Sequence, residues 1–252
     1  MAIHIKSAAE IEKMRVAGQV VARVHALMAE MIKPGVTTGE LDSAARQLIE
    51  EAGGTPSFLG YHGYPASICA SVGCEVVHGI PGDRVLQEGE IVSIDVGAYV
   101  NGFHGDAAVT YPVGAISEEL ADLIAASQRA FEAGYAKARA GNRVGDISAA
   151  IQAAIESAGY GVVLYYGGHG IGRMMHEDPS VPNYGEPNTG ARLQPGMALA
   201  VEPMLTLGSP ETRELEDGWT VVTVDGSPAA HYEHTILITE GDAEILTQLP
   251  ES

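Results

Sequence analysis

Two aspartates, Asp95 and Asp106, lie on either side of the dipeptide Asn101-Gly102, in a run of β-branched, aromatic and small residues from 91 to 111. Asn-Gly between such runs predicts a two-residue type I′ turn that joins two antiparallel strands. That turn pairs Gly97 with Asp106 and places both carboxylates on one face, one diagonal step apart. Buried carboxylates are costly unless a cation or hydrogen bonds compensate them. The pair is either a solvated acidic face or a cation site, and its apolar neighbours favour the cation site.

Three histidines are candidates for a nitrogen ligand or for proton transfer. His169 is surrounded by four glycines in the segment 167–172, and glycine lets backbone approach closely around a site. His176 follows it by seven positions, and His78 ends an apolar run before Gly79. For His78 the sequence indicates a structural role and a functional role equally. The residues that we interpret instead as surface or hydrogen-bonded histidines are His4, His25, His62 and His234.

The chain contains an internal repeat. Residues 35–53 and 141–159 share seven identities in nineteen positions without a gap. Further along, Asp95 follows Gly89 by six positions, and Glu202 follows Gly196 by six. The tripeptide 104–106 likewise matches 231–233, which sets Glu233 in the place of Asp106. Such a duplication predicts a pseudo-twofold structure in which four carboxylates converge at the centre.

Converging carboxylates are hard oxygen ligands and select hard or borderline divalent cations. Two such ions that share carboxylates and a water molecule form the arrangement used in two-metal hydrolysis. A transition metal would also be expected to take a nitrogen ligand, for which His169 is the first candidate.

The elements that must position these residues follow the same order twice, with two helices and then strands. We expect helices from Ser7 to about Met31, from Thr37 to Gly53, from Ser117 to about Arg139, and over about 145–158. Capping boxes open the first two helices, at Ser7 and Thr37. We expect one α+β domain over residues 1–252, with half-repeats of roughly 1–112 and 113–252, because each half alone would leave a sheet face uncovered.

Composition excludes several classes of partner. The formal charge is −19, with four lysines, which argues against nucleic acid and anionic membranes. No apolar run approaches the roughly 20 residues of a membrane span, and the N-terminus lacks the features of a signal peptide. Two cysteines, Cys69 and Cys74, are too few for a disulfide framework or a zinc ribbon. A cytoplasmic enzyme is expected.

The motifs resemble those of the type I methionine aminopeptidases, in family order and over nearly the whole chain. The segments that carry the resemblance are Tyr64-Pro65-x-Ser67-Ile68-Cys69, His78-Gly79-Ile80-Pro81, Ile94-Asp95-Val96, Gly102-Phe103-His104-Gly105-Asp106, Gly168-His169-Gly170-Ile171-Gly172, His176-Glu177, Val201-Glu202-Pro203 and Tyr232-Glu233-His234-Thr235. That family has the pita-bread fold, itself an internally duplicated α+β structure. The chain is similar to the short bacterial form, without a zinc-finger extension.

The resemblance implies a binuclear centre of Co, Mn, Fe or Zn, and residue roles within it. Its ligands would be Asp95, Asp106, His169, Glu202 and Glu233. Asp106 and Glu233 would bridge the ions, and Glu202 would also accept a proton from the attacking water. His176 would stabilise the tetrahedral intermediate, and His78 would assist proton transfer to the leaving amine.

The resemblance also implies an apolar methionine pocket, although each of its side chains could equally be core packing. The implied walls are Tyr61, Tyr64, Cys69, Met175 and Trp219. Met175 stands where relatives often carry Phe, which keeps the wall apolar and makes it more deformable. Gly73 and Cys74 depart from the family's Ser-x-Asn-Glu pattern, beside the place of a backbone-lined site for a monovalent cation.

The predicted function is removal of the initiator methionine from nascent polypeptides with a small second residue. The enzyme is expected to be a monomer that acts on N-termini, with the ribosome as one place where it would meet them. Rival interpretations are an X-Pro peptidase, which would carry a large extra N-terminal domain, and a non-catalytic binding protein of the same fold. A binuclear phosphohydrolase is a third, but its anionic substrate would call for basic residues near the metals. The motif segments offer only Arg173.

Overall fold

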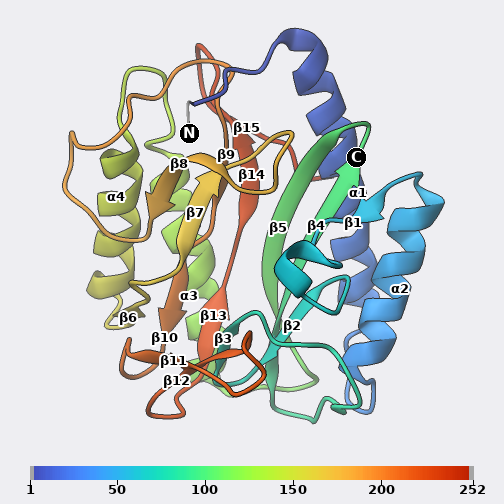
Figure 1. Cartoon of the computed structure of the whole chain (residues 1–252). Coiled ribbons are helices and arrows are strands. Elements are labelled where there is room, and N and C mark those ends of the chain that lie inside the picture. The colour runs from blue at the N-terminus through green and yellow to red at the C-terminus, as the bar shows by residue number, and fades with distance from the viewer. Residues whose placement is uncertain (1–2, 250–252) are drawn as a thin grey trace.

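The long hairpin predicted around Asn101-Gly102 is present in the computed structural model, which describes residues 3–249 (Figure 1). Strands β4 (Ile91–Val100) and β5 (Phe103–Pro112) pair in the predicted register, with Asp95 opposite Ala108 and Gly97 opposite Asp106. The turn residues have φ values of 53° and 87°, the positive values that a type I′ turn requires. The predicted domain limits, residues 1 and 252, lie outside the described residues.

The predicted helices are present. Their bounds are α1 (Ala8–Met31), α2 (Thr38–Glu51), α3 (Glu118–Tyr135) and α4 (Val144–Ser157). Both predicted capping boxes form, since the N–H groups of Ser7 and Thr37 donate to Glu10 Oε2 and Glu40 Oε2 at 2.8 and 2.7 Å. These bonds satisfy N–H groups that a helix start would otherwise leave without partners.

The predicted end of the third helix was wrong. It stops at Tyr135 instead of about Arg139. The N–H groups of Lys137 and Ala138 donate to carbonyls three residues back, so the last turn tightens and the helix is not propagated. The chain then turns and brings Gly141 to Leu193, where it donates a backbone hydrogen bond of 3.0 Å.

The remaining strands are short and form several antiparallel sheets. Their bounds are β1 (Thr55–Pro56), β2 (Cys69–Val72), β3 (Glu75–Val77), β6 (Gly161–Val162), β7 (Gly167–Gly170), β8 (Glu177–Pro182), β9 (Ala198–Val201), β10 (Met204–Thr206), β11 (Thr212–Glu214), β12 (Val221–Thr223), β13 (Ala229–His231), β14 (His234–Leu237) and β15 (Glu244–Ile245), with a 3-10 turn η1 (Tyr61–Gly63). One sheet holds β1, β4, β2 and β5, and another has the order β15-β14-β9-β7-β8.

Each half packs its own pair of helices on its own strands. In Figure 1, α1 and α2 lie on one side of the strands, and α3 and α4 lie on the other. The repeat-equivalent residues Ile49 and Ile155 are both fully buried, each in the apolar core of its half. Equivalent backbone bonds recur as well, since Gly35 donates to Leu86 at 2.9 Å just as Gly141 donates to Leu193. The fold is therefore an internally duplicated α+β structure.

The two halves meet where β5 runs beside the segment that joins β13 and β14. Ala108 and Glu233 exchange two backbone hydrogen bonds, of 3.3 and 2.8 Å. The Thr235 hydroxyl accepts from the N–H of Asp106 at 3.0 Å and lies 2.8 Å from its carbonyl oxygen. These contacts hold Asp106 and Glu233 side by side across the pseudo-twofold axis. Within residues 3–249, no helix is both long and apolar enough to cross a membrane.

Candidate metal centre

Four acidic side chains converge where the halves meet. Asp95 and Asp106 come from the middle of β4 and β5. Glu202 directly follows β9, and Glu233 lies between β13 and β14. One buried oxygen on each of Asp95, Asp106 and Glu233 has no hydrogen-bond partner. Buried polar atoms are nearly always satisfied, so these orphaned oxygens fit a bound cation.

Electrostatics give the same indication. Burial raises the pKa of Asp95 to about 7. Burial, and then the charges of Asp95 and Glu202, raises the pKa of Asp106 well above its usual range. Burial, and then the charges of Asp106 and Glu202, does the same to the pKa of Glu233. Like charges at such close quarters disfavour one another's ionised form, and divalent cations would reverse that penalty.

His169 on β7 points its Nε2 atom into this cluster. That atom lies 3.7 Å from Asp106 Oδ2 and 3.6 Å from Glu202 Oε1. The ring's Nδ1 lies 2.9 Å from the carbonyl oxygen of Gly170, which can only accept, so Nδ1 carries the proton. Burial lowers the pKa of His169 to about 3, so the ring is neutral with its lone pair on Nε2. The side chain is therefore oriented as a metal ligand is.

The glycines beside His169 are needed for close packing. A Cβ on Gly168 would lie 2.3 Å from the carbonyl oxygen of Ala200, and one on Gly170 would lie 2.2 Å from that of Asp178. Any larger residue would push β7 away from its neighbouring strands. The glycine-rich pattern thus reflects close approach of backbone rather than flexibility.

Metal-ligand geometry occurs in two overlapping groups among the described residues. One contains Asp106, His169 and Glu233, and the other contains Glu202, His231 and Glu233; in each, the candidate ligand atoms lie within 4.8 Å of one another. His231 was not singled out from the sequence as a candidate ligand. Its only signal was the repeat, which aligns it with His104, two residues before a buried carboxylate.

His78 and His176 lie at the edge of the centre. The ring centroid of His176 is 4.2 Å from that of His169, and the Tyr61 hydroxyl lies 2.8 Å from His176 Nδ1. His78 has a φ of 60°, a strained value for a residue with a Cβ, and such strain is concentrated at functional sites. Burial lowers the pKa of His78 to about 4, and burial followed by the charge of His62 lowers the pKa of His176.

A cavity of about 200 Å³ opens onto these groups. Its lining includes His78, His176, Asp95, Glu202 and His231. Two tyrosines that sequence reasoning did not single out, Tyr165 and Tyr166, also line it. They lie in a loop without a recognisable motif, which is why no sequence signal marks them.

The residues expected to form a methionine pocket gather in one apolar cluster. Tyr64, Cys69 and Met175 are buried in it, and Tyr61 and Trp219 pack against it. The rings of Tyr64 and Trp219 meet edge to face with centroids 5.1 Å apart. The Tyr64 hydroxyl donates to the carbonyl oxygen of Gly79 at 2.9 Å. This bond fixes the position of the Tyr64 ring within the cluster.

Gly73 and Cys74, which differ from the expected family pattern, form the turn between β2 and β3. Gly73 has a φ of 65°, a left-handed conformation that glycine and asparagine both tolerate, which explains why either residue serves there. Its carbonyl oxygen accepts a hydrogen bond of 2.9 Å from Ala229 N–H. Cys74 is half-buried with a free thiol.

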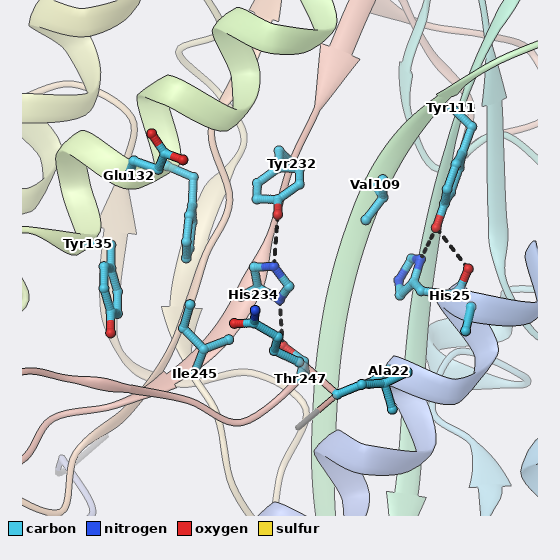
Figure 2. A pocket seen from close by; sticks show the side chains of 14 residues that line it. Ala22, His25, Val109, Tyr111, Glu132, Tyr135, Tyr232, His234, Ile245 and Thr247 are labelled. Carbon is cyan, nitrogen blue, oxygen red and sulfur yellow. Dashed lines mark hydrogen bonds between the residues drawn. The ribbon is translucent and has the colours of Figure 1, made fainter. Parts of the chain in front are cut away.

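A larger cavity lies elsewhere, between α1 and α3 (Figure 2). It has a volume of about 610 Å³, and its lining includes Val109 and Tyr111 of β5 and Tyr232, which lies between β13 and β14. The ring nitrogens of its two histidines, His25 and His234, are hydrogen-bonded. This cavity therefore presents no free imidazole nitrogen and no carboxylate cluster.

Comparison with known proteins agrees with this geometry. Residues 12–240 match the model of metallopeptidase family M24. The chain is 50% identical to methionine aminopeptidase 1 of Bacillus subtilis over 97% of this chain and 98% of that protein. It is 49% identical to methionine aminopeptidase 1 of Mycobacterium tuberculosis, over 96% and 94%. Methionine aminopeptidase from Thermotoga maritima superposes with a TM-score of 0.97 at 47% identity, over 98% of this chain and 100% of that one.

A prolidase from Pyrococcus furiosus shares the fold more distantly. Its TM-score is 0.80 at 24% identity, and the match covers 98% of this chain but only 66% of the prolidase chain.

Proposed function

The chain belongs to metallopeptidase family M24, and we propose that it is a methionine aminopeptidase that removes the initiator methionine from new polypeptides with a small second residue. The observation that carries this proposal is the convergence of carboxylates from both halves around His169. Similarity to methionine aminopeptidases over nearly the whole chain, at 50% and 47% identity, supports it. A non-catalytic protein of this fold would have no need to keep these side chains together.

We propose that two divalent ions, Co, Mn, Fe or Zn, are held by the clustered side chains. The residues that would hold them are Asp95, Asp106, His169, Glu202 and Glu233. The orphaned carboxylate oxygens and the free His169 Nε2 support this assignment. Bound divalent ions activate water at neutral pH and polarise the carbonyl under attack.

Glu202 is the proton acceptor in this proposal. Its side chain lines the cavity and is 13% exposed, compared with 5% for Asp106 and 2% for Glu233. Burial, followed by the charge of Asp95, raises the pKa of Glu202 well above its usual range, a penalty that bound divalent cations would reverse. A carboxylate that lines the cavity can then act as a general base toward a water molecule in it. It would take a proton from the attacking water and pass it towards the leaving amine.

His176 and His78 would handle the carbonyl and the amine. With the Tyr61 hydroxyl as donor to Nδ1, the neutral His176 ring carries its proton on Nε2 and can donate it to the developing oxyanion. His78, across the same cavity, would donate to the scissile amide and assist proton transfer to the leaving group. The lowered pKa of each ring keeps it neutral, and thus a single-proton donor, at pH 7.

The methionine side chain would bind among the walls Tyr61, Tyr64, Cys69, Met175 and Trp219. Met175 would let the wall adapt to the thioether, since methionine is unbranched and flexible. A bulky second residue would clash at the rim of the pocket, which is why small ones are preferred in this proposal.

The cellular setting is also a proposal. We propose a cytoplasmic monomer, built as one catalytic domain over residues 1–252 with halves of roughly 1–112 and 113–252, that meets nascent N-termini at the ribosome. The charge of −19 speaks against direct binding to nucleic acid. A monovalent cation would lie near the turn at Gly73.

Methionine release from a Met-Ala-Ser peptide tests the function. Metal-stripped protein should be inactive, should regain activity with Mn, Co, Fe or Zn, and should lose it when a bulky residue replaces Ala. Glu202→Gln and His176→Ala should abolish turnover while the protein stays folded. Full activity of either variant, or none in folded wild-type protein with any of these metals, would contradict the proposal.

A further inference from the structure

We propose that His231 is a further ligand of the metal centre, so that an imidazole from β13 binds the ion on the side of Glu202 and Glu233. This inference rests on the proposed function, because it adds a donor to the same centre. It gives the centre a second imidazole in addition to His169.

The position of the His231 ring carries the inference. Its Nε2 atom lies 3.7 Å from Glu202 Oε2 and 3.9 Å from Glu233 Oε2. Two donors on one ion, each with a bond of about 2.1 Å, lie at most about 4.2 Å apart. Both distances fall within that limit, as do the corresponding distances of 3.7 and 3.6 Å from His169. By this criterion His231 fits as well as the ligand that the resemblance implies.

The ring nitrogen also lacks any other partner. The His231 side chain is 2% exposed, and its Nε2 is buried without a hydrogen bond. Distances of 3.7 and 3.9 Å are too long for hydrogen bonds to the two carboxylates. A cation between the three groups would satisfy the imidazole and both carboxylates together.

The backbone of His231 is held in place from the other half of the molecule. Its N–H donates to the Thr110 hydroxyl at 2.9 Å, and that hydroxyl lies 2.8 Å from its carbonyl oxygen. Thr110 in turn lies 2.8 Å from the Ser93 hydroxyl. This buried network fixes the start of the side chain and so limits where the ring can point.

The two imidazoles flank Glu202 on opposite oxygens, since His169 lies by Oε1 and His231 by Oε2. Added nitrogen donors favour borderline ions such as Co, Fe and Zn over Mn, which prefers oxygen. The proposal therefore predicts a centre that discriminates against Mn through His231.

Metal binding by His231→Gln tests the inference. Calorimetric titration of the metal-stripped protein should show a loss of Co affinity at least as large as the roughly 10–100-fold that removal of an outer-shell partner causes, and a smaller loss of Mn affinity. The matched control is His25→Gln, which removes another buried imidazole. His25 is hydrogen-bonded to Tyr111 (Figure 2) and to the carbonyl oxygen of Ala107. This control variant should leave both affinities unchanged. Equal losses for Co and Mn in His231→Gln would overturn the proposal and indicate a hydrogen-bonding role.

X-ray absorption of the Co-loaded wild-type protein provides a readout that needs no variant. It should count two imidazoles per protein molecule, and one after His231→Gln. A count of one in the wild type would overturn the inference even if the variant failed to fold. If the Co-loaded wild-type protein had no peptidase activity, that result would count against the proposed function. It would not change the imidazole count.

Discussion

In the first half of the molecule, Asp95 and Asp106 lie in the middle of two uninterrupted strands, β4 and β5, each of ten residues. In the second half the equivalent strands are broken at the equivalent positions. β9 ends at Val201, and β10 begins only after Glu202-Pro203. Likewise β13 ends at His231, and β14 begins after Tyr232-Glu233.

The difference shows what duplication preserves and what it leaves free. Both halves bring two carboxylates to the shared centre, so the position of the charges is preserved. The backbone that presents them is not, and Pro203 cannot donate to a strand ladder at all. The breaks carry glutamates, whose side chains are longer than those of the aspartates. The Glu202 carboxylate lies beside the rings of His169 and His231. The first half thus supplies carboxylates from a regular hairpin, and the second supplies glutamates and imidazoles from irregular segments.

Asp95 and its repeat equivalent Glu202 should therefore differ in role. Substituting these two residues gives the largest effects on activity that we expect. Glu202→Gln should lower kcat about 10³-fold even at saturating metal, because it removes a proton acceptor as well as a ligand. Asp95→Asn should lower metal affinity, so that excess metal restores part of the activity. Steady-state kinetics over a range of metal concentrations separate the two cases. Glu156→Gln, exposed on α4, is the control and should keep full activity. If excess metal fully restored the activity of Glu202→Gln, Glu202 would act only as a ligand, as is expected of Asp95.

One ion pair ties the halves together next to the site. Lys6 Nζ lies 2.8 Å from Glu177 Oε2, with side-chain exposures of only 4% and 7%. Lys6→Met should lower the free energy of unfolding by roughly 3–5 kcal/mol, because it leaves the Glu177 charge buried and unpaired. Urea denaturation measures this loss, and Lys33→Met, on an exposed lysine, should stay within about 0.5 kcal/mol of wild type.

The same pair should make this loss depend on pH. Burial alone would raise the pKa of Glu177, but the hydrogen bond and charge of Lys6 lower it below 4.5. A lowered pKa in the folded state contributes stability above the unfolded pKa, and that contribution is lost as the pH falls through the folded pKa. The difference between wild type and Lys6→Met should therefore be full at pH 7. It should shrink as the pH falls first through the raised Glu177 pKa of the variant and then through the lowered Glu177 pKa of the wild type. A difference that grows on acidification would contradict the assigned pairing.

The two cores permit a direct test of equivalence. Ile49 on α2 and Ile155 on α4 occupy the same repeat position, and each is 0% exposed. Replacing either by Ala should cost about 2–5 kcal/mol, the range for large-to-small changes in a packed core. Thermal unfolding of both variants should show similar losses. If only one variant is strongly destabilised, the halves are packed unequally despite their shared plan.

Local signals made much of this arrangement predictable from the sequence. Asn101-Gly102 set the hairpin register, and the repeat brought Glu202 and Glu233 to the aspartates, because each signal is short-range or periodic. His231 was not predicted as part of the centre, because nothing in its neighbours along the chain shows that β13 docks beside β5. That contact depends on how the halves pack, through Ala108 and Glu233, and no local pattern encodes it.

The smallest expected difference lies at the starts of α2 and α4, which the repeat makes equivalent. In α2 the capping bonds are reciprocal, since Thr37 N–H donates to Glu40 Oε2 at 2.7 Å and Glu40 N–H donates to Thr37 Oγ1 at 3.2 Å. In α4 the residue in the place of Thr37 is Arg143, whose N–H donates to Asp146 Oδ2 at 2.7 Å but whose side chain has no acceptor to offer in return. Thr37→Ala should therefore cost about 1 kcal/mol of unfolding free energy, and Arg143→Ala less than about half of that. Parallel urea titrations resolve this difference, and equal losses would mean that the hydroxyl of Thr37 adds nothing to the bond that both helices share.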